Sequence, residues 1–113
     1  MKRAVTLKEN YEFRRLYQRG ASAAGGSMVL YCRKNRLDHN RLGLTASVKL
    51  GHAVVRNRAR RRLREVYRLN EHLFKPGYDI VVVARSRCIT ADFQKLTKAY
   101  LSLAQKAGIL VDP

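Results

Sequence analysis

The chain has 113 residues, the usual length of one domain, and residues 1–113 are expected to form a single domain. Lys and Arg number 24 against 8 Asp and Glu, and the net charge of +16 predicts a polyanionic partner, nucleic acid before an anionic membrane. The sequence has no Trp, no signal peptide and no apolar run near the roughly 20 residues of a membrane span, so we expect a cytoplasmic protein without a membrane partner.

The first predicted element is a helix over residues 7–19. Phe13, Leu16 and Tyr17 have the i, i+3, i+4 spacing of a buried helix face, acidic residues come early, and Gly20 follows the end. Residues 21–27 are small and Gly-rich, and they fit either a loop or a short edge strand.

Two strands are predicted next. Residues 28–33 are β-branched and aromatic, residues 34–40 have the polar character of a turn, and residues 41–48 suit the second strand of a hairpin. These segments predict the beginning of a β-meander.

The second half of the chain predicts helix, strand and helix. Residues 52–73 form the longest periodic segment, and proline and glycine at positions 76 and 77 stop it. Residues 78–85 are almost continuously apolar, which is typical of a central strand covered on both faces. Thr90 is the expected N-cap of a last helix that ends at Gly108. The order is helix, two or three strands, helix, strand, helix, which predicts an α+β sandwich.

The residue types of catalytic and metal sites are scattered. Cys32 and Cys88 form no Cys-x-x-Cys pair and have no His at metal-ligand spacing, so both are expected to be reduced thiols, Cys32 within a strand. The three His residues form no pattern with Ser, Asp or paired carboxylates. We therefore predict no catalytic residue and no metal ligand in this protein.

A helical wheel of residues 55–73 separates an apolar arc from an arginine face. The arc is expected to lie against the sheet and contains Val55, Ala59, Leu63, Val66 and Leu73. The rest of the circumference carries Arg58, Arg60, Arg61, Arg62, Arg64 and Arg68, with Arg56 at the boundary beside Tyr67.

An ordinary solvated helix face does not explain this pattern. Like charges four residues apart cost about 0.2 to 0.5 kcal/mol, and Glu65 is the only acid between Arg56 and Arg68. Seven of these thirteen positions are Arg and none is Lys, and guanidinium groups bind phosphates in pairs and stack on bases. The helix has few neutral polar side chains that could read base edges, Asn57 being the exception. Folded RNA is therefore a better match for this helix than DNA.

Three aromatic residues have two interpretations. Phe13, Tyr17 and Tyr31 fit core packing, but they also fit an aromatic floor beside the basic helix. Such a floor would stack single-stranded bases at roughly 1 to 3 kcal/mol each.

Four ordered blocks resemble the family of bacterial ribonuclease P protein subunits. They run in family order and are Leu7-Lys8-Glu9-Asn10-x-x-Phe13, Arg41-Leu42-Gly43-Leu44-Thr45, Gly51-x-Ala53-Val54-x-Arg56-Asn57-Arg58 and Asp79-Ile80-Val81-Val82-Val83-Ala84-Arg85. The resemblance implies an α+β fold shared with a ribosomal protein domain, in which a mixed four-stranded sheet and three helices follow the order α-β-β-β-α-β-α. It also implies a left-handed β-α-β crossover through the arginine helix, against the general chirality rule.

The resemblance further implies a subunit that helps a catalytic RNA remove the 5′ leader of precursor tRNA and raises its affinity for substrate and magnesium. The implied partners are the ribonuclease P RNA, one protein copy per RNA, and precursor tRNA, with magnesium ions held mainly by the RNA and the substrate. The RNA-binding residues would be Arg56, Asn57, Arg58, Arg60, Arg61, Arg64 and Arg68. The leader-binding cleft would be lined by Phe13, Tyr17, Tyr31, Ser47 and Lys49.

Three positions depart from the commoner family pattern. Tyr17 stands where Phe is frequent and keeps a stacking ring, Val48 replaces a second Lys before Lys49, and His52 stands where Asn is frequent. A ribosomal RNA-binding protein is the alternative with the same charge and size. A protein-only nuclease is disfavoured because the sequence shows no clustered carboxylate or His site.

Overall fold

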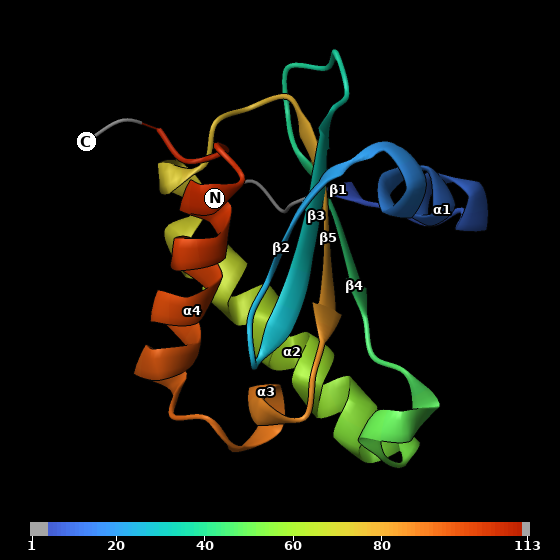
Figure 1. Cartoon of the computed structure of the whole chain (residues 1–113), viewed down its shortest axis with the longest axis vertical. Coiled ribbons are helices and arrows are strands. Elements are labelled where there is room, and N and C mark those ends of the chain that lie inside the picture. Colours follow the sequence, from blue (N-terminus) through green and yellow to red (C-terminus); the bar gives the residue numbers. More distant parts are fainter. Residues whose placement is uncertain (1–4, 112–113) are drawn as a thin grey trace.

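The computed structural model describes residues 5–111, in which α1 lies on one side of a sheet and α2 and α4 on the other (Figure 1). The sheet has the spatial order β1-β4-β5-β3-β2, and its strands are β1 (Val5–Thr6), β2 (Ala21–Ala24), β3 (Met28–Lys34), β4 (Arg41–Thr45) and β5 (Tyr78–Ala84). The α-helices are α1 (Asn10–Arg19), α2 (Ala53–Asn70), α3 (Arg87–Thr90) and α4 (Phe93–Lys106). Two 3-10 turns flank α2, namely η1 (Val48–Leu50) and η2 (Glu71–Leu73).

The apolar strand β5 is central, as its composition predicts. It pairs antiparallel with β3 and parallel with β4, and Ile80, Val81 and Val82 are fully buried. A strand covered on both faces cannot alternate polar and apolar residues, which explains its continuous apolar run.

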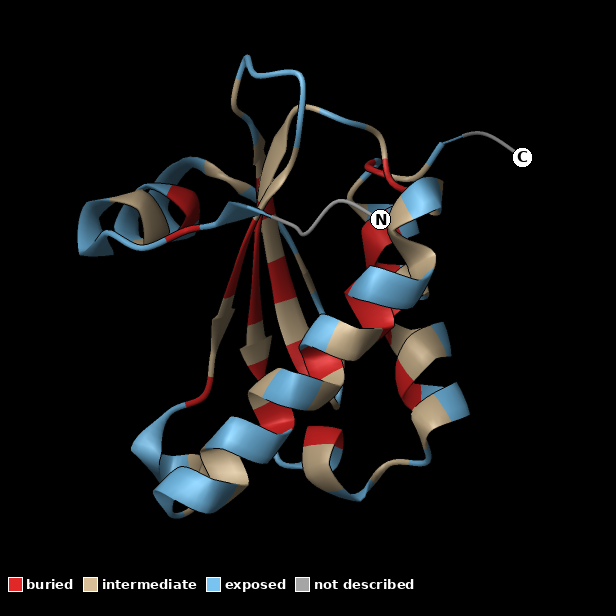
Figure 2. Cartoon of the chain, turned by 180° about the vertical axis from the view of Figure 1, so that it is seen from behind, coloured by how far each residue is buried: buried red, intermediate tan, exposed pale blue. Residues whose placement is uncertain are grey.

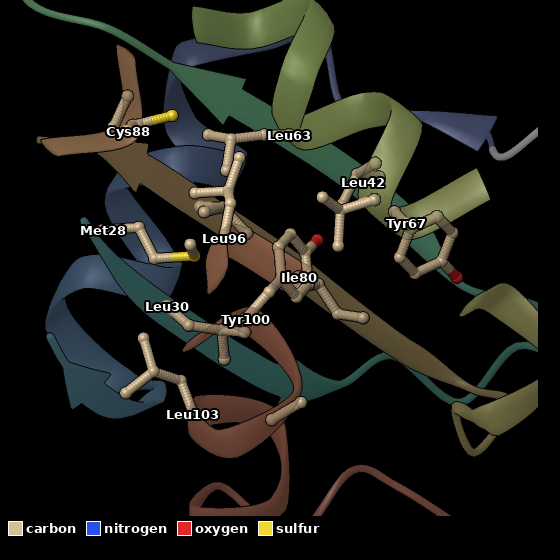
Figure 3. Packing of buried hydrophobic residues seen from close by; sticks show 14 of the residues in the cluster. Met28, Leu30, Leu42, Leu63, Tyr67, Ile80, Cys88, Leu96, Tyr100 and Leu103 are labelled. Atoms are coloured by element: carbon tan, nitrogen blue, oxygen red, sulfur yellow. The ribbon is translucent and has the colours of Figure 1, made fainter. Parts of the chain in front are cut away.

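The two faces of the sheet bury different clusters. On the α2 and α4 side, Leu30 and Ile80 pack with Leu96 and Tyr100, and Figure 3 shows these side chains meeting between the layers. On the α1 side, Leu16 and Val81 belong to a second, smaller hydrophobic cluster. Burial is accordingly concentrated along the sheet and the inner sides of α2 and α4, whereas α1 is largely exposed (Figure 2).

The sheet has five strands and not the expected four. The added strand β1 pairs parallel with Arg41 and Leu42 of β4. Its two residues are too few to display the alternation by which strands are predicted. The segment with two interpretations, residues 21–27, contains β2, which pairs antiparallel with β3.

The predicted hairpin of β3 and β4 is wrong. β5 lies between these two strands, and β4 is parallel to β5, to which α2 connects it. Nearness in sequence favours a hairpin, but the most apolar strand takes the centre of the sheet because both of its faces need cover.

Several element boundaries also differ, and the helix predicted to reach position 73 is α-helical only to Asn70 and continues as η2. Helix α1 begins at Asn10 and not at position 7, because Leu7 is buried and its backbone N–H bonds to the Leu42 carbonyl at 3.0 Å. The strand predicted to reach position 48 ends at Thr45, where the chain turns toward η1. Thr90 ends the short helix α3, which the sequence did not predict, and Asp92 is the N-cap of α4.

Candidate nucleic-acid interface

A groove of about 460 Å³ opens between α1, β4 and α2. Helix α1 supplies Asn10, Phe13, Arg14 and Tyr17; the end of β4 supplies Leu44, Thr45 and the following Ala46; and α2 supplies Arg60. The groove therefore joins an aromatic helix face to the arginine helix, a juxtaposition that sequence alone could not establish.

Phe13 reaches the sheet because Gly43 has no side chain. A Cβ atom built on Gly43 would lie 2.6 Å from Phe13 Cε1 and 2.8 Å from Phe13 Cζ. The ring thus occupies the space above the strand, and Phe13 also packs against the small cluster around Leu16. Phe13 therefore belongs to the core and also lines the groove.

Tyr17 and Tyr31 form an aromatic pair at the groove. Their ring centroids lie 4.9 Å apart with an interplanar angle of 71°, an edge-to-face contact. Tyr17 is 43% exposed and lines the groove, while Tyr31 is half-buried and packs against the cluster beneath α1. Tyr31 therefore supports the accessible ring of Tyr17.

An ion-pair network holds α1 against the sheet. Arg41 donates from Nε and Nη2 to both carboxylate oxygens of Asp79, at 2.8 and 2.7 Å, and from Nη1 to Glu12 Oε2 at 2.6 Å. The hydrogen bond to Asp79 raises the pKa of Arg41 above its ordinary value. Because Glu12 belongs to α1, these bonds help fix the helix that forms one wall of the groove.

Most of the predicted RNA-binding residues lie on the exposed side of α2. Arg60 lines the groove, and its Nη2 donates to Asn57 Oδ1 at 2.6 Å. Arg56 is half-buried, and its Nε has no hydrogen-bond partner among the described residues. The exposed members of the set are Asn57, Arg58, Arg61, Arg64 and Arg68.

The side chain of Arg68 is partly committed within the helix. Its Nε donates to Glu65 Oε2 at 2.9 Å, and a second contact joins the same two groups. This hydrogen bond raises the pKa of Arg68 and lowers the pKa of Glu65. The local acid thus neutralises one end of the arginine face.

The helical wheel places Arg62 on the arginine face of α2, but its guanidinium group is bound within the protein. Its Nη1 donates to the Ile89 carbonyl at 2.6 Å, and its Nη2 donates to the Ala91 carbonyl. These carbonyls end α3, so Arg62 ties α2 to that helix. Tyr67, predicted at the boundary of the apolar arc, is buried with 1% exposure.

Ser47 and Lys49 stand beside the groove and not among its lining residues. Ser47 directly follows the groove residue Ala46 and precedes η1, which contains Lys49, and both side chains are exposed. The predicted cleft set is therefore brought together around Phe13 and Tyr17, with Ser47 and Lys49 at its margin.

Several groove residues lie outside the predicted cleft set, among them Asn10, Arg14 and Thr45. Asn10, Phe13, Arg14 and Tyr17 are spaced i, i+3, i+4 and i+7, so they share one face of α1. That periodicity was available in the sequence, whereas Thr45 becomes a lining residue only through the placement of β4.

The chemistry of the groove is that of anion and base recognition. Its charged lining groups are the guanidinium groups of Arg14 and Arg60, beside the rings of Phe13 and Tyr17, and no carboxylate lines it. Guanidinium groups suit phosphate oxygens, and aromatic rings suit unstacked bases. Over residues 5–111, no group of three or more His, Cys, Asp or Glu is arranged to hold a metal ion. Among the helices in that range, none has the length and apolarity to cross a bilayer.

Comparison with known proteins identifies related sequences along almost the whole chain. The sequence model of the family described as Ribonuclease P matches residues 1–108. The ribonuclease P protein component of Natranaerobius thermophilus is 42% identical over 110 residues, which cover 97% of this chain and 96% of that protein. The corresponding protein of Clostridioides difficile is 40% identical over 110 residues, covering 96% of each chain.

Solved structures share the fold. The Staphylococcus aureus RNase P protein superimposes with a TM-score of 0.83 at 32% identity, covering 96% of this chain and 99% of that one. The Thermotoga maritima RNase P protein gives a TM-score of 0.81 at 28% identity, covering 96% and 98%.

Proposed function

Because the chain belongs to the ribonuclease P protein family, as the protein component of the ribonucleoprotein that processes the 5′ end of precursor tRNA, we propose that its groove holds the 5′ leader. The observation that carries this proposal is the placement of Tyr17 and Arg60 in one groove. A stacking ring beside a guanidinium group can hold one base and one phosphate of a single strand. Arg14 provides a second cation on the opposite wall.

We assign the exposed arginine face of α2 to the ribonuclease P RNA, the partner that the family implies. Arg58, Arg61 and Arg64 are exposed on this helix, and Arg56 and Asn57 lie in its first turns. Each phosphate that these groups neutralise should add about 0.7 to 0.9 to the slope of log affinity against log salt concentration. We place Ser47 and Lys49 at the margin of the leader site.

The proposed mechanism is indirect. The protein neutralises phosphates and holds the leader, and it contributes no nucleophile or general base. Magnesium ions would be held by the RNA and the substrate, because Arg14 and Arg60 give the groove a positive charge that repels a divalent cation. On the RNA and the substrate, these ions would supply an activated water and stabilise the leaving oxygen. A bound leader would raise the affinity of the holoenzyme for substrate and, because the substrate helps to hold the magnesium ions, its affinity for magnesium as well.

We propose that the chain is one cytoplasmic domain and that one copy acts on each RNA. In its support, one hydrophobic cluster joins β3, β4 and β5 to α2 and α4. The family's left-handed crossover is part of the same proposal, and its strands would be β4 and β5 with α2 between them.

One reconstitution tests the function. Purified protein is added to precursor tRNA with and without a ribonuclease P RNA, at a magnesium concentration where the RNA alone is nearly inactive. We expect cleavage only when both are present. Cleavage without the RNA would indicate a protein-only nuclease, and no stimulation, with binding to ribosomal RNA instead, would indicate the ribosomal alternative.

The leader site has its own test. Replacing Phe13 or Tyr17 by Ala should reduce the affinity of the holoenzyme for precursor tRNA and leave its affinity for mature tRNA unchanged, because only the precursor has a leader. An equal loss for both substrates would contradict leader binding in the groove. Thermal unfolding of each variant controls for loss of the fold.

A further inference from the structure

We propose that the outer face of α1 is a second stacking site for single-stranded RNA, with Tyr11 as its platform, which binds leader nucleotides beyond those in the groove. This inference rests on the proposed function, because it extends the path of the same strand. It concerns a surface of α1 that does not line the groove.

Tyr11 is an exposed aromatic residue held in place by an arginine. Its side chain is 59% exposed, more than the 43% of the groove residue Tyr17. The guanidinium carbon of Arg15 lies 5.8 Å from the centroid of the Tyr11 ring, a cation–π contact. The ring is thus positioned, but most of its surface is open to a ligand.

Arg14 connects this ring to the groove. It lines the groove, and it stands three residues from Tyr11 and three from Tyr17. Three residues correspond to a separation of about 60° around a helix. Going around α1 from the groove, the side chains follow in the order Tyr17, Arg14, Tyr11 and Arg15. An alternation of rings and cations matches the bases and phosphates of an extended single strand.

The charge of α1 fits an anionic partner. Arg14, Arg15 and Arg19 are exposed and form no ion pair within residues 5–111, while Glu12 of the same helix is paired with Arg41 at 2.6 Å. Tyr11 is accompanied on this face by charged and polar side chains. An apolar protein partner would find one ring there and no hydrophobic patch, so RNA is the better match.

The position of α1 leaves this face accessible. The helix projects from the sheet on the side opposite α2 and α4, and no other element covers its outer turns (Figure 1). The burial colouring shows exposed residues along that outer side (Figure 2). A strand leaving the groove past Arg14 would meet Tyr11 without displacing any element of the fold.

The test uses the reconstituted holoenzyme and precursor tRNAs whose leaders increase in length one nucleotide at a time. For Tyr11→Ala we expect unchanged affinity with the shortest leaders and a loss of about five- to tenfold once the leader extends past Arg14 to Tyr11, the lower part of the range for one stacked base. Tyr11→Phe should retain the affinity, and Tyr11→Leu should lose it, because stacking needs the ring. Arg15→Gln should weaken binding at the same leader lengths.

Controls separate this site from the groove. Phe13→Ala should weaken binding already with short leaders, and Val111→Ala, which shortens an exposed apolar side chain in another part of the fold, should have no effect. Equal losses for Tyr11→Ala at every length, including mature tRNA, would overturn the proposal and indicate contact with the ribonuclease P RNA or the tRNA body. No loss at any length would overturn it too. If Phe13→Ala does not change the affinity for precursor tRNA with any leader, leader binding in the groove is contradicted, independently of the result for Tyr11.

Discussion

Arg41 of β4 and Asp79 of β5 are directly opposite each other in adjacent parallel strands, and their side chains form a bidentate ion pair. The same guanidinium group reaches Glu12 of α1. Asp79 Oδ1 also accepts a hydrogen bond at 2.9 Å from Asn35, in the segment that follows β3. One half-buried arginine thus links two strands to the helix that carries Phe13 and Tyr17.

Replacing Arg41 by Lys should destabilise the fold and loosen α1. The substitution keeps the charge but removes the guanidinium group that donates to both Asp79 and Glu12. We expect it to lower the free energy of unfolding by about 1 to 3 kcal/mol. Urea denaturation measures this cost. The control is Arg33→Lys, because Arg33 is the other cross-strand neighbour of Asp79 and forms no ion pair in the described part of the chain. Equal effects of both substitutions would contradict the role given to the network.

Gly43→Ala should move Phe13 out of its position. The new methyl group would lie within 2.6 Å of the ring, so the ring or the helix must shift. We expect a loss of about 1 to 3 kcal/mol in stability. We also expect weaker discrimination between precursor and mature tRNA, measured with the reconstituted holoenzyme. Gly108→Ala is a control for discrimination alone: a Cβ there meets no neighbouring atom, although its φ of +78° makes some loss of stability expected.

Arg61 and Arg62 are sequence neighbours with different predicted roles. Arg62→Gln should lower the free energy of unfolding by about 1 to 2 kcal/mol, because the carbonyls of Ile89 and Ala91 lose a charged donor. Arg61→Gln should change stability by less than about 0.5 kcal/mol. It should instead reduce the slope of log affinity for the ribonuclease P RNA against log salt by about 0.7 to 0.9. A loss of stability for Arg61→Gln and a change in salt slope for Arg62→Gln would refute these two roles.

Charge reversal at Arg60 and Arg64 together should weaken holoenzyme assembly and raise the magnesium concentration needed for cleavage. Two acidic groups would repel phosphates where the cations attract them, and more magnesium would be required to screen the repulsion. The measurement is precursor cleavage as a function of magnesium concentration. Charge reversal at Lys98, an exposed cation on α4, is the matched control. Unchanged cleavage at low magnesium in the Arg60 and Arg64 variant would refute the roles given to Arg60 in the groove and to Arg64 on the exposed face of α2.

Alkaline pH should destabilise the protein partly through Cys88. Burial raises the pKa of this thiol from 9.0 to about 11, so the folded state keeps the proton over a range where the unfolded state loses it. The stabilisation is therefore complete below pH 9 and is lost as pH rises from 9 to about 11, by about 2 to 3 kcal/mol in total. Burial raises the pKa of Tyr67 and Tyr100 as well, with the same sign.

The variant Cys88→Ala isolates that contribution. At neutral pH it should be less stable than the natural protein, because a buried side chain is shortened. The difference in the free energy of unfolding should shrink between pH 9 and 11, because only the natural protein has the thiol whose ionisation favours the unfolded state. A difference that stays constant with pH, measured by urea denaturation, would contradict the burial effect. Thr90→Ala, an exposed position of the same short helix, should show no such pH dependence.

Local patterns in the sequence predicted the longer helices and strands and the cationic chemistry of α2, although they missed β1 and α3. The 3.6-residue period separates Ala59 and Leu63, which are buried, from Arg61 and Arg64, which are exposed, and the apolar run of β5 predicts its central position. The i, i+3, i+4 spacing also predicts the side of α1 that faces the sheet at Phe13 and Leu16, whereas Tyr17 of the same set is exposed at the groove. These properties depend on neighbours within one or two turns, so a single segment displays them.

The tertiary structure alone decided which distant segments meet. It placed β5 between β3 and β4, brought Tyr17 to Arg60, and took Arg62 out of the free arginine face. No periodicity within a segment encodes these contacts, because strand order depends on which arrangement buries the most apolar surface over the whole chain. The sequence therefore determined that α2 carries a cationic face, and the packing of α1, β4 and α2 decided that this face borders an aromatic groove.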